Sequence, residues 1–154
     1  WMCLSGDKSR ARDYIEGLNV LSSMRLCSNV PAQYAIKAAL SNNEETQSLF
    51  MPGGRIYEQR EFICSALSSI EGISVVKPKA AFYVFPKIDI KRFNITDDEK
   101  FALDFLRSKK VLLVHGTGFN WPSPDHFRIV YLPEIDTLRE ATTRLKDFLA
   151  TYRQ

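Results

Sequence analysis

The pattern of apolar residues changes at Gly72, and this change limits the chain to a mixed fold of helices and short strands. Before Gly72, apolar residues recur at the three- and four-residue spacing that is typical of amphipathic helices. A long helix is predicted between the Pro52-Gly53-Gly54 turn and Gly72, which closes it. Its apolar stripe consists of Ile56, Ile63, Leu67 and Ile70.

Two further helices are predicted in the first 50 residues. Ser5 is expected to cap a helix that continues to about Met24. Pro31 is expected to be the first residue of a second helix, which ends near Leu40. The first part of the chain is therefore predicted to be helical throughout.

After Gly72 the apolar runs become short and rich in β-formers. Strands are predicted over residues 73–76, 81–85, 111–114 and 127–132. The Thr96–Glu99 segment has the pattern of a capping box and predicts a helix to about Ser108. Asp136 is expected to cap a last amphipathic helix. The order predicts an α+β fold, in which helices cover a small antiparallel or mixed sheet.

Composition excludes several classes of function. The chain has 154 residues, a size typical of one domain, and its net charge is +3 with both signs interspersed. This charge is too small and too mixed for a nucleic-acid-binding protein. No apolar run approaches the roughly 20 residues of a membrane helix. The three cysteines are odd in number and far apart, which favours buried free thiols in a reducing, cytoplasmic environment.

Arg128 is the residue that most needs an explanation. It lies in the run Phe127–Leu132, where the residues on both faces of the predicted strand are apolar. A buried guanidinium needs a partner, and its planar fork matches a carboxylate. Three interpretations remain open on the sequence alone. The guanidinium pairs with an acidic residue of the same domain, it reaches water at a strand end, or it binds a carboxylate that arrives with a substrate.

Other candidate catalytic groups have simpler explanations. Lys8 and Lys109 each follow a serine, but Lys8 lies in a polar helix start, and Lys109 is a cation near a helix C-terminus. His115 and His126 are too few and too far apart to predict a metal site. No histidine or aspartate pattern marks Cys27 as a nucleophile. We therefore expect no catalytic residue, metal ligand or cofactor ligand among these side chains.

Several segments together resemble the C-terminal part of class I/II pyridoxal-phosphate-dependent aminotransferases of fold type I. Among these, the chain looks most similar to the bacterial alanine (glutamate–pyruvate) branch. The matching segments follow the family's order along almost the whole chain. They are WMCLSG, YIEGL, SMRLCSNVPAQYAI, PGGRIYEQR, AFYVFPKID and VLLVHGTGFNWPSPDHFRIVYLP.

The resemblance implies a homodimeric enzyme that transfers an amino group between an amino acid, alanine or glutamate, and a 2-oxo acid. It implies that Arg128 binds the substrate α-carboxylate, and that Ser28 and Asn29 lie in a loop near the active site of the neighbouring subunit. Residues 1–50 would be a helical segment that bridges from a large domain, and residues 51–154 would be the α+β small domain.

The resemblance also places the cofactor lysine before Trp1, where the chain would have been cut from a longer protein. The chain alone is therefore expected to bind no pyridoxal phosphate and to be inactive. Ala80 stands where relatives often have glycine, and Phe119-Asn120 replaces a frequent Phe-Gly. The alternative is a non-catalytic α+β module that binds a small carboxylate or a protein partner. An RNA-binding domain is disfavoured, because the basic residues are scattered.

Overall fold

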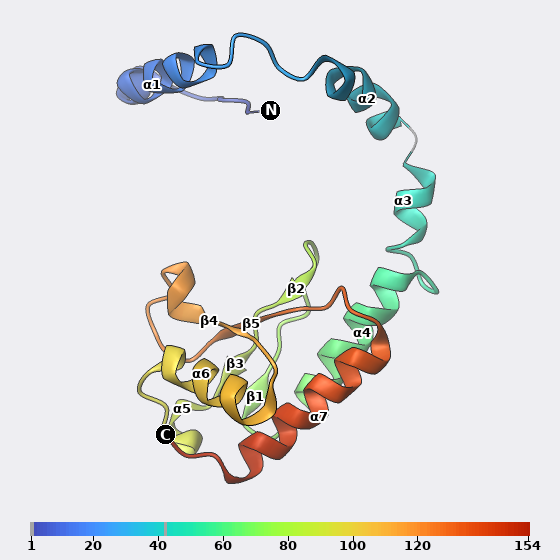
Figure 1. Ribbon diagram of the computed structural model, residues 1–154, viewed down its shortest axis with the longest axis vertical. Helices are drawn as coiled ribbons and strands as arrows, with labels where there is room; N and C mark the ends of the chain where they lie inside the picture. The colour runs from blue at the N-terminus through green and yellow to red at the C-terminus, as the bar shows by residue number, and fades with distance from the viewer. Residues whose placement is uncertain (1, 42) are drawn as a thin grey trace. The chain divides into compact units, whose positions relative to one another are not determined.

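A computed structural model of the protein describes residues 2–41 and 43–154 (Figure 1). The chain separates into two compact units, Trp1–Glu44 and Glu45–Gln154. The predicted division after residue 50 stays a prediction. The interpretation of Trp1 as a cut within a strand lies outside the described residues.

The first unit contains helices but no core of its own. The elements are a 3-10 turn η1 (Ser9–Ala11), helix α1 (Arg12–Ser23) and helix α2 (Val30–Ser41). None of the residues that the structure describes in this unit is buried, and Leu26 is 93% exposed. The prediction that Ser5 caps the first helix is wrong. Neither η1 nor α1 has a side-chain cap, and the amide and hydroxyl of Ser9, the first residue of η1, donate hydrogen bonds to the Asp7 carboxylate.

The second unit contains the long helices and all the described strands. The helices are α3 (Glu44–Ser48, which begins at the boundary), α4 (Arg55–Ser68), α5 (Ile90–Phe93), α6 (Asp98–Lys109) and α7 (Ile135–Thr151). The strands are β1 (Ile73–Ser74), β2 (Tyr83–Val84), β3 (Lys87–Ile88), β4 (Val114–His115) and β5 (Phe127–Val130), and a 3-10 turn η2 (Gly116–Phe119) follows β4. The predicted α+β class is confirmed, although the strands are shorter than expected, and β3 and α5 were not predicted.

The strands form two small antiparallel sheets. β1 pairs with β3, and β5 lies between β2 and β4 in a three-stranded sheet. A bridge between Lys87 and His126 joins the two sheets. β5 is therefore the central strand, and its residues alternate between the two faces of the sheet.

The core lies between the sheet and the helices α4, α6 and α7. Figure 1 shows α4 and α7 side by side, and α6 contacts both α7 and β4. Val84, Phe127 and Tyr131 point into this core and are each about 1% exposed. Their neighbours Tyr83 and Val130 are 44% and 43% exposed. One face of the sheet is thus covered by helices, and the other face, which carries Arg128, is partly open.

Two predicted helix caps are wrong. Helix α6 is capped by Asp97, whose side chain accepts a hydrogen bond from the Lys100 amide, and not by Thr96. Helix α7 begins after Glu134 without a side-chain cap, so Asp136 lies inside its first turn. At the start of α6, the Thr96 amide, which the capping box was expected to satisfy locally, is satisfied by a contact from far along the chain.

The side chain of Gln154 provides those contacts at the start of α6. Its Oε1 accepts hydrogen bonds from the Thr96 amide (2.6 Å), the Thr96 hydroxyl (3.0 Å) and the Asp97 amide (2.9 Å). Its Nε2 donates to the Asp97 carbonyl at 2.6 Å. The last residue of the sequence therefore fastens the segment after α7 to the beginning of α6.

Among the described residues, no helix is both long enough and apolar enough to cross a membrane.

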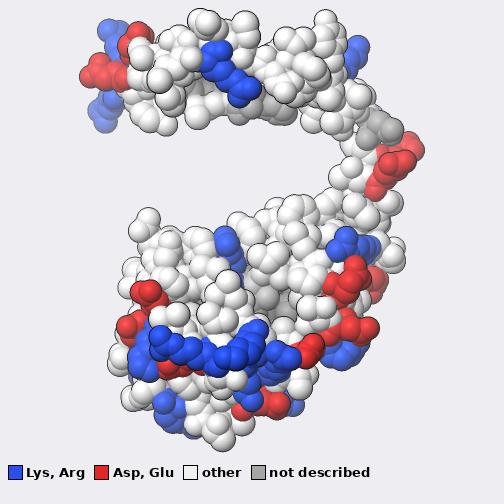
Figure 2. Space-filling model, viewed as in Figure 1, with Lys and Arg blue, Asp and Glu red and all other residues white. Residues whose placement is uncertain are grey.

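Figure 2 shows a band of Lys and Arg side chains that runs between acidic side chains on one face of the second unit. Both signs of charge therefore share this face.

We predict that Gln154→Ala lowers the free energy of unfolding by about 1–2 kcal/mol, because four partly exposed hydrogen bonds are lost. Urea denaturation measures the change. Thr151→Ala is the control. Thr151 is an exposed residue at the end of α7, the helix that precedes Gln154, and its replacement should change stability by less than about 0.5 kcal/mol. Equal stability of the two variants would contradict the role of Gln154.

Candidate functional site

Arg128 lies on the central strand of the three-stranded sheet. It pairs with Val114 of β4, and the next two residues of β5 pair with β2. Strand alternation turns Arg128 away from the helical core, together with Val130 and Leu132. This face was expected to be apolar and covered. That expectation is wrong within this chain, because Val130 is 43% and Leu132 is 38% exposed.

The Arg128 guanidinium is surrounded by aromatic rings. Its Cζ lies 4.3 Å from the centre of the Phe119 ring and 5.3 Å from the centre of the Tyr83 ring. Its Nε is buried and has no hydrogen-bond partner. Among the ion pairs of residues 2–41 and 43–154, none includes Arg128. The internal acidic partner, which was one of the three open interpretations, is thus not found in the described structure. Arg128 as a whole is partly exposed, so part of its side chain reaches the surface of the unit.

A loop between β4 and β5 carries Phe119, and Asp98 of helix α6 fixes its beginning. The Asp98 carboxylate is 3% exposed and accepts hydrogen bonds from the Thr117 amide (2.9 Å) and hydroxyl (2.7 Å). Gly116 permits the close approach of the two loop ends, because a Cβ there would lie 2.7 Å from the His126 carbonyl oxygen. The start of the loop is therefore held by hydrogen bonds to the Asp98 carboxylate and by the close backbone approach that Gly116 permits.

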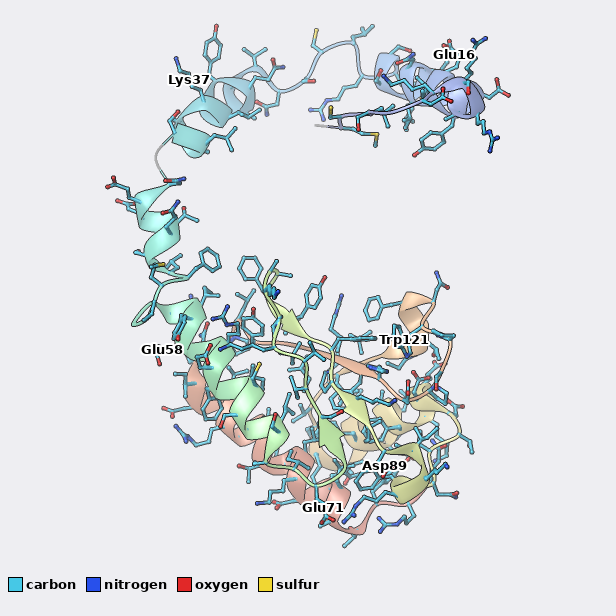
Figure 3. The ribbon with its side chains drawn as sticks, turned by 180° about the vertical axis from the view of Figure 1, so that it is seen from behind. Glu16, Lys37, Glu58, Glu71, Asp89 and Trp121 are labelled. Carbon is cyan, nitrogen blue, oxygen red and sulfur yellow. The ribbon has the colours of Figure 1, made fainter. Side chains whose placement is uncertain are left out.

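Asp125 fixes the end of the same loop, which carries Trp121 (labelled in Figure 3). Its Oδ1 accepts hydrogen bonds from Trp121 Nε1 (2.9 Å) and His126 Nδ1 (2.7 Å), and Lys87 Nζ lies 3.3 Å from Oδ2. Partial burial alone would raise the pKa of Asp125. The bonds from His126, Trp121 and Lys87 outweigh burial and lower this pKa to about 2. Asp125 is therefore a carboxylate at neutral pH and joins three donors.

The turn before β2 is strained at Ala81. Its φ is +64°, a left-handed conformation that costs a residue with a side chain roughly 1–2 kcal/mol. The Tyr131 hydroxyl donates to the Ala81 carbonyl at 2.8 Å and holds this turn beside the sheet. Ala80, which was compared with glycine in relatives, is not among the residues with positive φ. The residue that adopts the left-handed conformation is the next one, Ala81.

Ser28 and Asn29 belong to the first unit, and both are exposed. Asn29 Oδ1 accepts a hydrogen bond from the Ala32 amide at 3.1 Å, at the beginning of α2. This contact is typical of a helix N-cap. Asn29 thus has a structural role, and an active-site role for Ser28 and Asn29 stays a prediction.

No lysine of the described residues is buried. Lys8 is exposed next to η1, and Lys109 lies in the last turn of α6. Within residues 2–41 and 43–154, no group of three His, Cys, Asp or Glu side chains is arranged to hold a metal ion. The prediction that the cysteines are buried is wrong for Cys3 and Cys27, which are exposed. Cys64 is partly buried, and burial raises the pKa of its thiol, which makes it a poor nucleophile.

Sequence reasoning found Arg128 but missed the residues that surround it. Phe119 was noted as a departure from a family pattern, and Tyr83 was assigned to a strand. The available signal was the strand alternation that places Tyr83 opposite Val130 and hence on the face of Arg128. No comparable signal in the sequence marks Asp125, because two of its three donors reach it only through the folded loop and β3.

Comparison with known proteins was made at the level of sequence and of structure. Residues 5–145 match the family described as aminotransferase class I and II. The chain is 56% identical to the glutamate-pyruvate aminotransferase AlaA of Haemophilus influenzae and 48% identical to an alanine aminotransferase of Mycobacterium tuberculosis. Both matches cover 100% of this chain, and respectively 38% and 36% of the relative. The chain thus spans less than two-fifths of the length of these relatives.

Two solved structures are similar to the whole chain or most of it. The crystal structure of an aminotransferase from Escherichia coli has a TM-score of 0.90 and 55% identity, and the match covers 100% of this chain and 38% of that one. An alanine aminotransferase from Pyrococcus furiosus has a TM-score of 0.73 and 37% identity, over 93% of this chain and 35% of that one.

The lowered pKa of Asp125 predicts a pH dependence of stability. A carboxyl group whose pKa falls on folding stabilises the protein above its unfolded pKa, here near 3.8, and loses this contribution as the pH drops toward about 2. Between pH 5 and pH 2, wild type should therefore lose about 2 kcal/mol more unfolding free energy than Asp125→Asn. Urea denaturation across this range measures the difference. Parallel curves for the two proteins would contradict the assignment.

Proposed function

Because the chain belongs to the class I and II aminotransferases, we propose that it provides the part of such an enzyme that binds the substrate α-carboxylate through Arg128. The proposal rests on the surroundings of the Arg128 guanidinium. The rings of Phe119 and Tyr83 lie next to it, and its Nε is buried without a hydrogen-bond partner. No described acidic residue pairs with it. A cation in this setting is stabilised by an anion that comes from outside the domain.

Arg128 would act by positioning the substrate. A guanidinium presents parallel N–H donors that match the two oxygens of a carboxylate. A carboxylate held in this way fixes the direction of the bond to its α-carbon and hence the place of the α-amino group. Holding reactants in a productive orientation is a large source of rate enhancement in enzymes. The central strand suits this role, because it is hydrogen-bonded on both sides.

The family implies pyridoxal phosphate as the cofactor of the whole enzyme, where it would serve as an electron sink. A lysine that binds such a cofactor as a Schiff base needs desolvation or a cationic neighbour within a pocket. The described lysines of this chain do not fit, because none of them is buried. We therefore assign no cofactor ligand and no proton transfer to this chain.

The relatives suggest the substrates. Since the names of the most similar proteins are glutamate-pyruvate and alanine aminotransferase, we propose that the enzyme transfers an amino group between alanine or glutamate and a 2-oxo acid. The same proposal includes a cytoplasmic homodimer and a small domain formed by residues 51–154. Residues 1–50 would connect this domain to a large one, with Ser28 and Asn29 near the neighbouring active site.

We predict that Arg128→Lys lowers kcat/KM for L-alanine by about 30- to 100-fold, because lysine cannot replace the planar pair of charged hydrogen bonds. The assay uses a chimera in which this chain replaces the matching 38% of the Escherichia coli aminotransferase. Arg139→Lys is a matched control, since Arg139 also lies over an aromatic ring, Phe62, but on helix α7. A kcat/KM for Arg128→Lys within twofold of the control would contradict the proposal.

We predict that the chain by itself has no aminotransferase activity. Mixed with pyridoxal phosphate, L-alanine and 2-oxoglutarate, it should form no pyruvate in a coupled lactate dehydrogenase assay, because no described lysine is desolvated. The chimera serves as the positive control in the same assay. Turnover by the isolated chain that disappears on mutation of one of its lysines would contradict this prediction.

A further inference from the structure

We propose that Phe119 is a positioning residue for Arg128: its ring covers one face of the guanidinium, so that a carboxylate meets the terminal amino groups end-on and not Nε. This inference rests on the proposed carboxylate-binding function and adds the direction of approach. Phe119 itself contacts no acidic group in the described structure and would act through Arg128.

The geometry of the two side chains supports this role. The centre of the Phe119 ring lies 4.3 Å from Cζ of Arg128, which is closer than the 5.3 Å of Tyr83. Nε is bonded directly to Cζ, and it is the atom of Arg128 that is buried without a partner. A ring over the guanidinium excludes water from that face and attracts the cation through its π electrons. Because the Nε proton points along the guanidinium plane, the ring would keep Nε from a partner by holding the guanidinium in the orientation that buries Nε. Carboxylate binding is therefore left to the terminal nitrogens.

The loop holds the Phe119 ring in place on its other side. Phe85, which follows β2, makes edge contacts with Phe119 (6.4 Å between ring centres) and with Trp121 (5.5 Å). The carboxylates of Asp98 and Asp125 anchor the two ends of the loop. Phe119 is nevertheless 44% exposed, so burial of the ring does not explain its position. The contacts that hold the ring are those with Phe85 and with Arg128.

Trp121 provides a matched control within the same loop. It is 40% exposed, similar to Phe119, and it contacts Phe85 and His126, but it is not among the rings that lie over Arg128. A general loosening of the loop should therefore follow from a change at either aromatic residue. A change in the Arg128 guanidinium should follow from a change at Phe119 alone.

The test uses NMR on the full 154-residue chain labelled with ¹⁵N. The first readout is the rate at which the Arg128 Nε proton exchanges with water. The second is the affinity for pyruvate, measured by titration with sodium pyruvate and followed at the Arg128 guanidinium signals. The variants are Phe119→Leu, Phe119→Ala and the control Trp121→Phe. The hydrogen-bonded indole proton of Trp121 shows whether the loop remains folded in the two Phe119 variants.

We expect both Phe119 variants to speed Nε proton exchange by about tenfold or more, because the proton loses its cover. We expect pyruvate affinity to fall by about three- to tenfold, with Phe119→Ala more affected than Phe119→Leu. Trp121→Phe should change neither value by more than about twofold. Exchange and affinity in Phe119→Ala that equal those of Trp121→Phe would overturn the role of Phe119.

Arg128→Gln separates this inference from the proposed function. With this variant, pyruvate binding is followed at the backbone amides of β5, and it should be lost. If Arg128→Gln still binds pyruvate with the affinity of wild type, the proposed function fails. The exchange rate of the Arg128 Nε proton in the Phe119 variants would still decide whether Phe119 covers the guanidinium.

Discussion

The partly buried guanidinium of Arg128, with its unpartnered Nε, is the constraint on which the candidate site depends. A permanent cation that is removed from water loses hydration energy, and the protein must compensate for this loss or leave a binding site for an anion. Here the described structure compensates only in part, through the rings of Phe119 and Tyr83. Cation–π contacts are worth about 0.5–2 kcal/mol each. The remaining deficit favours binding of a carboxylate.

The surrounding fold is arranged to keep this cation in one orientation. Asp98 and Asp125 hold the two ends of the loop, and each satisfies more than one donor. Since both are tied to protein groups, neither is available to neutralise Arg128. The acidic residues nearest to the loop thus have a structural role, and the site keeps its positive charge for a substrate.

Much of the fold could be predicted from the sequence, because it follows from periodicity. The apolar stripe of α4 is a local pattern that predicted Ile63 and Leu67 in the core. The alternation of β5 is a second local pattern, and it predicted that Phe127 and Arg128 point to opposite faces of the sheet. The capping error at Thr96 arose where a distant contact replaced a local one. Gln154 is separated from Thr96 by 58 residues, and no local pattern could identify it as the acceptor for the Thr96 amide.

The same distinction explains why Arg128 was found and Phe119 was not. An arginine among apolar strand residues is visible in a single line of sequence, because its burial conflicts with its charge. Phe119 lies in a loop whose path depends on Gly116, on a left-handed Asn120 (φ +59°) and on Asp125, so its position over Arg128 exists only after folding.

In the first unit, the apolar periodicity of the sequence is not matched by burial of side chains. Helices α1 and α2 have 12 residues each, which is at the lower limit for helices that are stable alone in water. Most of the stability of such helices comes from packing of an apolar face. Yet no described residue of this unit is buried, and Tyr14, Leu21 and Leu40 are each more than 60% exposed. The apolar periodicity of α1 and α2 therefore corresponds to no buried stripe among the described residues, whereas that of α4 and α7 is satisfied by the core that supports Arg128.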